Sequence, residues 1–446
     1  MIKVVKFGGS SVANSRQLTK VKNIVMSDPT RKFVVTSACG KESHEDHKIT
    51  DLLYLCEAHV RYGVSYHSIF DLVKKKYYQI KEDLHLTTDL DREFEMIERH
   101  MTRDLSTDFL VSRGEYLTAR LLAEYLDAEF VDAADCIAFH YDGTIDMERT
   151  AALLERCAQS EKKVVIPGFY GALPNGVIKV MSRGGSDITG SVIANIVGAD
   201  VYENWTDVSG FLVADPRIID SPMRIPCITY NELREMSYMG ANVLHDDAVF
   251  PVRNKNIPIN IRNTNEPDNP GTMIMNDTSE IDAIDPPHAV TGITGRKDYT
   301  CITLIKSHSS AEVGFLRRLL SIFEDFRVSI ESVPVTVDTF SVIMASRAVD
   351  NCLYDIVARI KKELAPDDMK IEDHIALVAV VGRGMKAVPG ASGRFLSEFG
   401  RNHINIKIIN QTADELSIVV GVENRDFEKA IHCIYDKFIA EEKKTV

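Results

Sequence analysis

The chain contains 446 residues, more than one hydrophobic core usually holds, so we expect two or three domains. Its net charge of −13 and the lack of a basic block argue against nucleic acids and membranes as main partners. No apolar run is long enough to span a bilayer, and the first residues read as a strand and not as a signal peptide. The 8 cysteines form no C-x-x-C pair, which is typical of a cytoplasmic protein and not of a disulfide framework or a zinc site.

The first motif lies at the start of the chain. The apolar run Ile2–Phe7 is followed by Gly8-Gly9-Ser10-Ser11 and then by a helical pattern. Glycines after a strand let the backbone approach a bulky anion, and the N–H groups of a helix start point at it. Lys6 adds a positive charge at the same place. The motif predicts a phosphate-binding turn, although a plain strand–helix connection uses the same residues, and no Walker A pattern occurs.

Residues 1 to about 283 alternate short β-rich runs with longer helical patterns. This alternation predicts a mainly parallel sheet with helices on both faces, and ligands of such sheets bind beyond the carboxyl ends of the strands. The segment Asp285-Pro286-Pro287 marks the expected domain boundary. The predicted strands are 32–36, 129–131, 164–167, 201–205 and 257–261, and the predicted helices are 50–61, 65–83, 90–104, 108–126 and 186–197.

The rest of the chain contains an internal repeat with an offset of 76 positions, which aligns Gly314 with Gly390 and Phe323 with Phe399. Each unit reads strand, helix, strand, strand, helix. Two such units predict a pair of ferredoxin-like modules. In the first unit the predicted elements are 301–305, 311–325, 328–333, 339–345 and 350–363.

No segment at the end of the second unit can supply the fourth strand of the second module. The first module can use Lys370–Asp373, but the second ends on a predicted helix, 426–440. Residues 289–293, which precede the first module, are free to fill this edge. We therefore predict that the first module is inserted within the second.

Several segments of the first domain carry the residue types that phosphoryl transfer to a carboxylate needs. The segment Ser182–Asp187 (SRGGSD) places a Gly-Gly turn before a helix start, with an arginine before it and an acid after it. An arginine fork suits a carboxylate, whereas an acid at a helix start is more commonly a cap. Glu115 suits a substrate ammonium or a surface ion pair. The segments 205–210 and 215–217 read as polar loops that suit a nucleotide or a simple turn.

Together these motifs resemble the aspartate kinase family. The resemblance rests on Lys6–Val12 (KFGGSSV), Ser182–Asp187 (SRGGSD), Trp205–Val208 (WTDV) and Asp215–Arg217 (DPR). It implies an α/β fold: an αβα sandwich with a mainly parallel sheet, of the amino acid kinase or carbamate kinase-like type, plus two C-terminal ferredoxin-like ACT domains. The implied domains are the catalytic domain 1–285, the inserted first ACT domain 296–375, and a second ACT domain made of 286–295 and 376–446. The likeness is to the monofunctional enzymes.

The resemblance also implies a reaction, the ATP-dependent phosphorylation of the L-aspartate β-carboxylate to 4-phospho-L-aspartate, which begins the pathway to lysine, threonine and methionine. Lys6 and Asp187 would be catalytic: Lys6 would neutralise charge on the transferring phosphoryl group, and Asp187 would hold Lys6 or another group of the reacting centre in place. Mg²⁺ would arrive bound to ATP, and the motifs do not identify its protein ligands. The implied substrate-binding residues are Ser37, Thr50, Glu115, Arg183, Gly184 and Ser186, and the nucleotide-binding residues are Lys6, Gly8, Gly9, Ser10, Thr206, Asp207 and Arg217.

Regulation is implied by the ACT pair. Such domains bind an amino acid, and we expect lysine, alone or with threonine, at Gly314, Phe315, Leu316 and Glu331. An exposed strand charge is the plainer interpretation of Glu331. Assembly through the ACT domains predicts a homodimer or a larger oligomer.

Two departures from the family pattern concern the nucleotide. The family commonly has tyrosine at the position of Leu212 and lysine at the position of Asn242, so we expect weaker ATP binding. Together with Asp246, which stands where the family has proline, these changes leave open a catalytically weak amino-acid sensor of the same fold. A kinase acting on glutamate, acetylglutamate or a nucleoside monophosphate is a second alternative, which the ACT pair disfavours.

Overall fold

The computed structural model describes residues 1–43, 45–182, 184–240, 246–276, 278–284, 289–308 and 312–440. They divide into two compact units. The first consists of Met1–Phe211, Arg224–Leu233 and Asn242–Pro286, and the second of Leu212–Met223, Arg234–Ala241 and Pro287–Val446. Two short segments that the sequence assigned to the catalytic domain thus group with the second unit. The predicted boundary at 285–287 lies outside the described residues.

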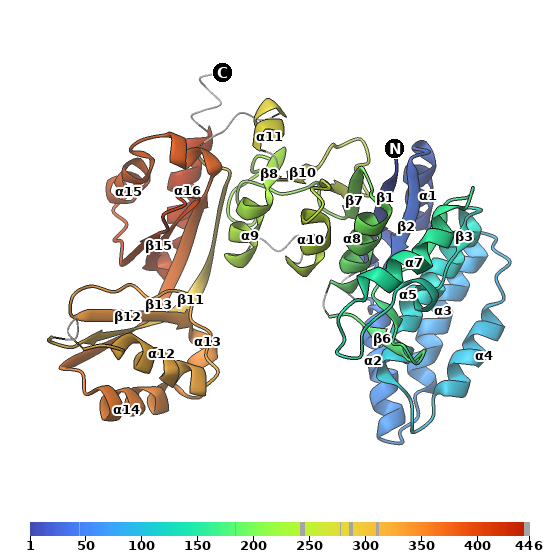
Figure 1. Cartoon of the computed structure of the whole chain (residues 1–446), viewed down its shortest axis with the longest axis horizontal. Helices are drawn as coiled ribbons and strands as arrows, with labels where there is room; N and C mark the ends of the chain where they lie inside the picture. The colour runs from blue at the N-terminus through green and yellow to red at the C-terminus, as the bar shows by residue number, and fades with distance from the viewer. Residues whose placement is uncertain are drawn as a thin grey trace. The chain divides into compact units, whose positions relative to one another are not determined.

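The first unit is built on a mainly parallel sheet, which confirms the predicted fold class (Figure 1). In the part of the chain that the structure describes, its strand order is β3-β4-β2-β1-β7-β9-β10-β8. Strand β10 pairs antiparallel with β9, and β8 pairs parallel with β10, so these two strands run opposite to the other six of this order. The strands are β1 (Lys3–Phe7), β2 (Arg31–Thr36), β3 (Glu129–Phe130), β4 (Val164–Pro167), β7 (Val201–Thr206), β8 (Cys227–Thr229), β9 (Ile259–Asn263) and β10 (Thr272–Met275), and β5 (Tyr170–Ala172) pairs with β6 (Ile178–Val180) in a separate hairpin.

Strand β1 lies at the point where the strand order changes direction. The chain continues from β1 to β2 on one side, whereas β7 pairs with β1 on the other side. All three strands are parallel, so their carboxyl ends meet at one edge of the sheet. In open α/β sheets this edge, at the change of direction, is where ligands bind.

Helices cover both faces of the sheet. On one face Val5 and Phe7 join a core cluster with residues of α1 to α5. On the other face Lys6 meets α8. The helices of this unit are α1 (Ser15–Ser27), α2 (Ile49–Arg61), α3 (His67–Asp83), α4 (Leu90–His100), α5 (Thr107–Tyr125), α6 (Ala133–Cys136), α7 (Met147–Ala158), α8 (Gly185–Val197), α10 (Asp246–Arg253) and α11 (Thr278–Ile284), while α9 (Tyr230–Tyr238) has residues in both units.

The second unit contains one antiparallel sheet with the order β12-β11-β13-β15-β14 among the described residues. Its elements are β11 (Gly292–Ile305), β12 (Thr339–Ala345), β13 (Asp368–Val381), β14 (Ile408–Gln411) and β15 (Ser417–Glu423), with α12 (Phe315–Asp325), α13 (Ser346–Val349), α14 (Leu353–Leu364), α15 (Ala391–Arg401) and α16 (Phe427–Tyr435). Both α12 and α15 begin after a left-handed glycine, Gly314 and Gly390, as the repeat predicts.

The two modules share the long strands β11 and β13. The first part of β11 pairs with the second part of β13, where Gly292 and Ile293 lie opposite Val381 and Val380. This part of β13 also pairs with β15 of the second module. The segment before the first module therefore lies at the edge of the second module's sheet. This is the arrangement that insertion requires, while the predicted domain limits themselves stay a prediction.

One predicted strand of the first module is wrong. Residues 328–333 form no regular strand and contribute the isolated bridge between Ser332 and Ile343. Glu331 N–H donates to the Ile343 carbonyl at 2.8 Å, and Ile343 N–H donates to the Ser332 carbonyl at 3.0 Å, so two successive residues face one residue of β12 and the regular ladder is disrupted. The Pro334 carbonyl accepts from Ser341 N–H at 3.0 Å, but proline has no N–H to donate in return. The predicted helix 90–104 also ends earlier, at His100.

The packing of α8 on the sheet depends on Gly190. A Cβ atom at this position would lie 2.6 Å from the Tyr202 hydroxyl on β7. We expect Gly190→Ala to destabilise the first unit by about 1–3 kcal/mol, because helix and strand must separate. Thermal unfolding followed by circular dichroism measures this, and Gly400→Ala is the control, since a Cβ at Gly400 meets nothing within 4 Å. Equal midpoints for the two variants would contradict the prediction.

Candidate active site

A buried ion pair lies at the carboxyl end of β1. The Lys6 ammonium lies 2.6 Å from Asp187 Oδ1, and the Lys6 side chain is 8% exposed. Asn204 on β7 donates a hydrogen bond of 2.8 Å to the same carboxylate oxygen. Asp187 comes from the first turn of α8. Strands β1 and β7 and helix α8 thus place a lysine with a fixed orientation beside the glycine turn.

The glycine turn itself packs tightly against the loop after β2. Gly8 N–H donates to the Trp205 carbonyl at 2.9 Å, and Gly40 N–H donates to the Gly9 carbonyl at 2.9 Å. A Cβ at Gly40 would lie 2.5 Å from the Gly9 carbonyl carbon, so a larger residue does not fit there. Ser10 lies in a short 3-10 helix, Gly9–Val12. The predicted phosphate turn is therefore a compact backbone loop one residue beyond β1.

Glu115 lies in α5 and is buried, with 4% of its surface exposed. Burial raises the pKa of its carboxyl group to about 8, although a hydrogen bond from the Ala38 backbone opposes this effect. Among the described residues, its Oε2 atom has no hydrogen-bond partner. An unsatisfied carboxylate oxygen in the interior is costly, and a ligand cation would satisfy it. This state fits the predicted contact with a substrate ammonium.

The other predicted substrate residues lie on neighbouring segments, with one exception. Ser37 follows β2, and its N–H donates to the Phe7 carbonyl at 3.1 Å. Thr50 lies in the first turn of α2, whose start is joined to Cys39 by a backbone hydrogen bond of 3.3 Å. Gly184 and Ser186 lie at the start of α8. Arg183 lies outside the described residues.

The predicted nucleotide residues fall into two groups. Thr206 and Asp207 follow directly on Trp205, which accepts the Gly8 hydrogen bond, so both lie beside the glycine turn. Arg217 belongs to the second unit, where its exposed guanidinium pairs with Asp215 at 2.6 Å. The first group adjoins the turn and Arg217 belongs to the other unit, and the nucleotide role of all three residues stays a prediction.

The predicted effector residues lie in the second unit. Gly314 is the N-cap of α12, Phe315 is buried, and Leu316 is the next residue of the same helix. Glu331 precedes β12, and its N–H donates to Ile343 at 2.8 Å. The contacts of these residues do not identify an effector, so their role in binding one stays a prediction. The departure at Asn242 lies outside the described residues.

Sequence reasoning missed Asn204. In the register of β1 and β7, Asn204 lies opposite Lys6. Two consecutive buried polar residues in one strand, Glu203 and Asn204, are a usable signal, because buried polar groups need partners. The identity of their partners depends on the strand order, which the local sequence does not contain.

Comparison with known proteins gives the same family for both units. The amino acid kinase family profile matches residues 1–263, and an ACT domain profile matches residues 378–438. Aspartokinase 3 of Bacillus subtilis is 35% identical over 454 residues, which cover 98% of this chain and 99% of that protein. The chain belongs to the amino acid kinase family, and within it to the aspartate kinases.

Solved structures agree with this assignment. The crystal structure of Clostridium acetobutylicum aspartate kinase, described as an important allosteric enzyme, has a TM-score of 0.91 and 45% identity, and covers 98% of this chain and 99% of that one. Escherichia coli aspartokinase III, solved with lysine and aspartate, shares the fold at a TM-score of 0.78 and 24% identity, with coverage of 98% and 99%. These findings confirm the resemblance, the fold class and the enzyme class that the motifs predicted. No described helix of this aspartate kinase is long and apolar enough to cross a bilayer.

The Lys6 ammonium gives a direct prediction. We expect Lys6→Met to lower kcat by about 10²–10³-fold, because a preorganised charge near the transferring group is lost. The KM for aspartate should change by less than about threefold, since the substitution removes a contact made to the transition state and not one that binds aspartate in the ground state. Steady-state kinetics measure both values. Lys32→Met is the matched control, since Lys32 is a β2 lysine that bonds to the Ser160 carbonyl, and a similar loss of activity in both variants would contradict the prediction.

The raised pKa of Glu115 predicts a pH dependence of binding. Below about pH 8 the carboxyl group is protonated, and it must release its proton to pair with an ammonium. We expect the Kd for L-aspartate to rise about tenfold when the pH falls from 7.5 to 6.5. Isothermal titration calorimetry in buffers of different ionisation enthalpy should show proton release on binding. Glu115→Gln should bind weakly with no such pH dependence.

The same group has a predicted effect on stability. Its folded-state pKa of about 8 lies above its ordinary value of 4.5, so the folded state holds the proton more tightly. The stabilisation is complete below about pH 4.5 and is lost as the pH rises to 8. Thermal unfolding of Glu115→Gln without ligand should therefore match wild type near pH 4 and exceed it by a growing margin as the pH rises toward 8. A constant difference across this range would contradict the raised pKa.

Proposed function

We propose that the enzyme transfers the terminal phosphoryl group of ATP to the β-carboxylate of L-aspartate, giving 4-phospho-L-aspartate and ADP. The observation that carries this proposal is the placement of Lys6 and Glu115 around one backbone junction. Lys6 Nζ lies 3.6 Å from the Cβ position of Gly8. A Cβ atom at Gly9 would lie 3.1 Å from the Ala38 carbonyl oxygen, and the Ala38 backbone forms a hydrogen bond with the Glu115 carboxylate. Lys6 in β1, a cation for phosphate, and Glu115 in α5, an acid for an ammonium, thus adjoin the same pair of loops.

The chemistry needs positioning and charge more than proton transfer. An aspartate β-carboxylate is ionised at neutral pH, so its oxygen attacks the terminal phosphorus without a general base. The bond from that phosphorus to the bridging oxygen breaks, and ADP leaves with the electron pair. Lys6 stabilises the negative charge on the transferring group, and Asp187 with Asn204 holds Lys6 in place.

The two substrates take opposite sides of Lys6 in this proposal. Aspartate binds with its ammonium on Glu115 and its α-carboxylate on Arg183. The remaining contacts to aspartate come from Ser37, Thr50, Gly184 and Ser186. The nucleotide phosphates lie on the N–H groups of the glycine turn, with contacts from Gly8, Gly9, Ser10, Thr206, Asp207 and Arg217.

Mg²⁺ fits as a partner of the nucleotide. Among the residues described here, no three His, Cys, Asp or Glu side chains are grouped as a metal site. The Asp207 carboxylate is exposed at the end of β7 beside the glycine turn and is a hard oxygen donor of the kind Mg²⁺ prefers. When bound, the ion would neutralise phosphate charge, and Asp207 would hold it.

Regulation by an amino acid belongs to the same proposal. We propose that lysine, alone or with threonine, binds the ACT modules at Gly314, Phe315, Leu316 and Glu331, and that the chain forms a homodimer or larger oligomer through them. The support is the left-handed turn that starts α12 and the allosteric character of the Clostridium relative. If lysine acts through affinity, bound substrates must weaken lysine binding by the same factor.

A trapping assay tests the proposed reaction. Purified enzyme with ATP, Mg²⁺, L-aspartate and hydroxylamine should form aspartyl hydroxamate, because hydroxylamine captures acyl phosphates. L-glutamate in place of L-aspartate should give no more than background, and Lys6→Met serves as the inactive control. Absence of hydroxamate without added amino-acid effectors would favour the sensor alternative and contradict the proposal.

A further inference from the structure

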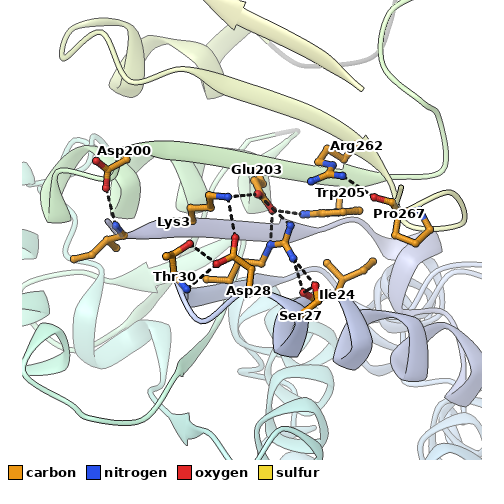
Figure 2. A network of polar contacts seen from close by, with 12 residues as sticks. Lys3, Ile24, Ser27, Asp28, Thr30, Asp200, Glu203, Trp205, Arg262 and Pro267 are labelled. Carbon is orange, nitrogen blue, oxygen red and sulfur yellow. Dashed lines mark hydrogen bonds and ion pairs between the residues drawn. The ribbon is translucent and has the colours of Figure 1, made fainter. Parts of the chain in front are cut away.

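A buried charge network lies on the face of the sheet opposite Lys6. Figure 2 shows Glu203 of β7 at its centre. Arg31 of β2 donates to both Glu203 oxygens, at 2.8 and 3.3 Å, and Lys3 of β1 lies 3.4 Å from one of them. The Glu203 side chain is 2% exposed and that of Arg31 is 6% exposed. Three neighbouring strands are therefore joined at Glu203, by the buried Arg31 and by the partly exposed Lys3, which also pairs with Asp28 at 2.9 Å.

Moving charged groups out of water costs desolvation free energy, so a buried network of this kind calls for an explanation. Replacing a buried ion pair by apolar residues of similar size is often neutral for stability or even favourable. The Arg31–Glu203 pair is therefore weak evidence for stabilisation alone. What distinguishes it is a third contact, since the Trp205 indole N–H donates to Glu203 at 2.8 Å.

Trp205 connects this network to the glycine turn. Its ring packs on the ring of Phe7, with centroids 6.1 Å apart. Its carbonyl accepts the Gly8 N–H at 2.9 Å and the Ser11 hydroxyl at 3.4 Å. The side chain held by Glu203 therefore belongs to the residue whose backbone holds the phosphate turn.

Arg262 of β9 holds the same indole from another direction. Its guanidinium carbon lies 4.5 Å from the ring centroid of Trp205, and it donates to the Pro267 carbonyl at 2.6 Å, as Figure 2 shows. The loop after β9 also reaches the turn, because the Thr264 hydroxyl lies 2.7 Å from the Ser11 hydroxyl. The guanidinium carbon of Arg31 lies 5.3 Å from the same ring centroid. The indole is thus fixed by a hydrogen bond at its nitrogen, by Phe7 and by two guanidinium groups.

We propose that Glu203 and Trp205 are positioning residues for the phosphate turn, and that the indole–carboxylate hydrogen bond sets the place of the Trp205 carbonyl and therefore of Gly8. The inference rests on the proposed function, since it takes the turn to be the site of the nucleotide phosphates. It assigns no contact with either substrate to Glu203 or Trp205. Loss of the hydrogen bond should weaken nucleotide binding and leave aspartate binding unchanged.

Trp205→Phe is the primary test, because it removes the N–H and keeps an aromatic ring. We expect the Kd for Mg·ADP, measured by calorimetry, to rise about tenfold, the size of one lost hydrogen bond to a charged group. The KM for ATP should rise similarly, while the KM for aspartate stays within about twofold. Tyr230→Phe is the matched control, since it removes one buried hydrogen bond, to the Ile257 carbonyl, away from the turn.

Two double variants separate positioning from folding. Arg31→Met with Glu203→Leu removes both charges and the acceptor, and it should fold yet reproduce the tenfold loss. Arg31→Met with Glu203→Gln keeps an oxygen that accepts the indole N–H, so its Kd should stay within about threefold of wild type. Trp205 is the single tryptophan of the chain, so its emission spectrum reports whether the indole keeps its environment in both.

The outcomes decide between the two proposals. If the Leu-containing variant folds and binds Mg·ADP like wild type, or if Trp205→Phe binds it like Tyr230→Phe, the positioning role is wrong. Calorimetry gives this answer without any turnover. If wild type binds Mg·ADP but forms no hydroxamate from aspartate, the proposed function fails, whatever the variants show.

Discussion

The contact between Lys6 and Asp187 is the constraint on which the first unit depends. A buried ammonium needs a counter-charge, and here the two charges come from a strand and from a helix on one face of the sheet. Asn204 adds a third element, because it donates to the same carboxylate from β7. The start of α8 is thereby held at the carboxyl ends of β1 and β7. A kinase whose chemistry is mainly electrostatic gains from this, since the charge is oriented before a substrate arrives.

The two faces of the sheet carry different polar clusters, the Lys6–Asp187 ion pair on one face and the Glu203 network on the other. Alternation along β1 directs Lys6 toward α8 and Phe7 toward α1 and the core. The same alternation along β7 directs Asn204 toward the ion pair and Trp205 toward the buried network. The face that carries Lys6, the residue that we propose stabilises the transferring phosphoryl group, therefore has a second polar cluster on the opposite side of the sheet. Both clusters act on the same short turn, Gly8 to Ser11.

Much of this could be predicted from the sequence because the key motifs are contiguous. The glycine turn with Lys6 and the repeat that aligns Gly314 with Gly390 are visible in short windows. The position of Asn204 opposite Lys6 in the strand register was not predictable, since it depends on β1 lying beside β7. The Arg31–Glu203 pair depends in the same way on the neighbourhood of β2, β1 and β7. Local patterns specify elements and turns, whereas long-range strand order specifies which polar groups meet.

The most direct test of the account is a crystal structure of the enzyme with L-aspartate and Mg·ADP bound. The account predicts that the aspartate ammonium lies within about 3 Å of Glu115 Oε2 and that the ADP phosphates accept hydrogen bonds from the turn that starts at Gly8. Lys6 and Arg183 should face the same pocket, between the β-carboxylate and the terminal phosphate of ADP. Aspartate bound away from Glu115, or Lys6 and Arg183 in separate pockets, would contradict it.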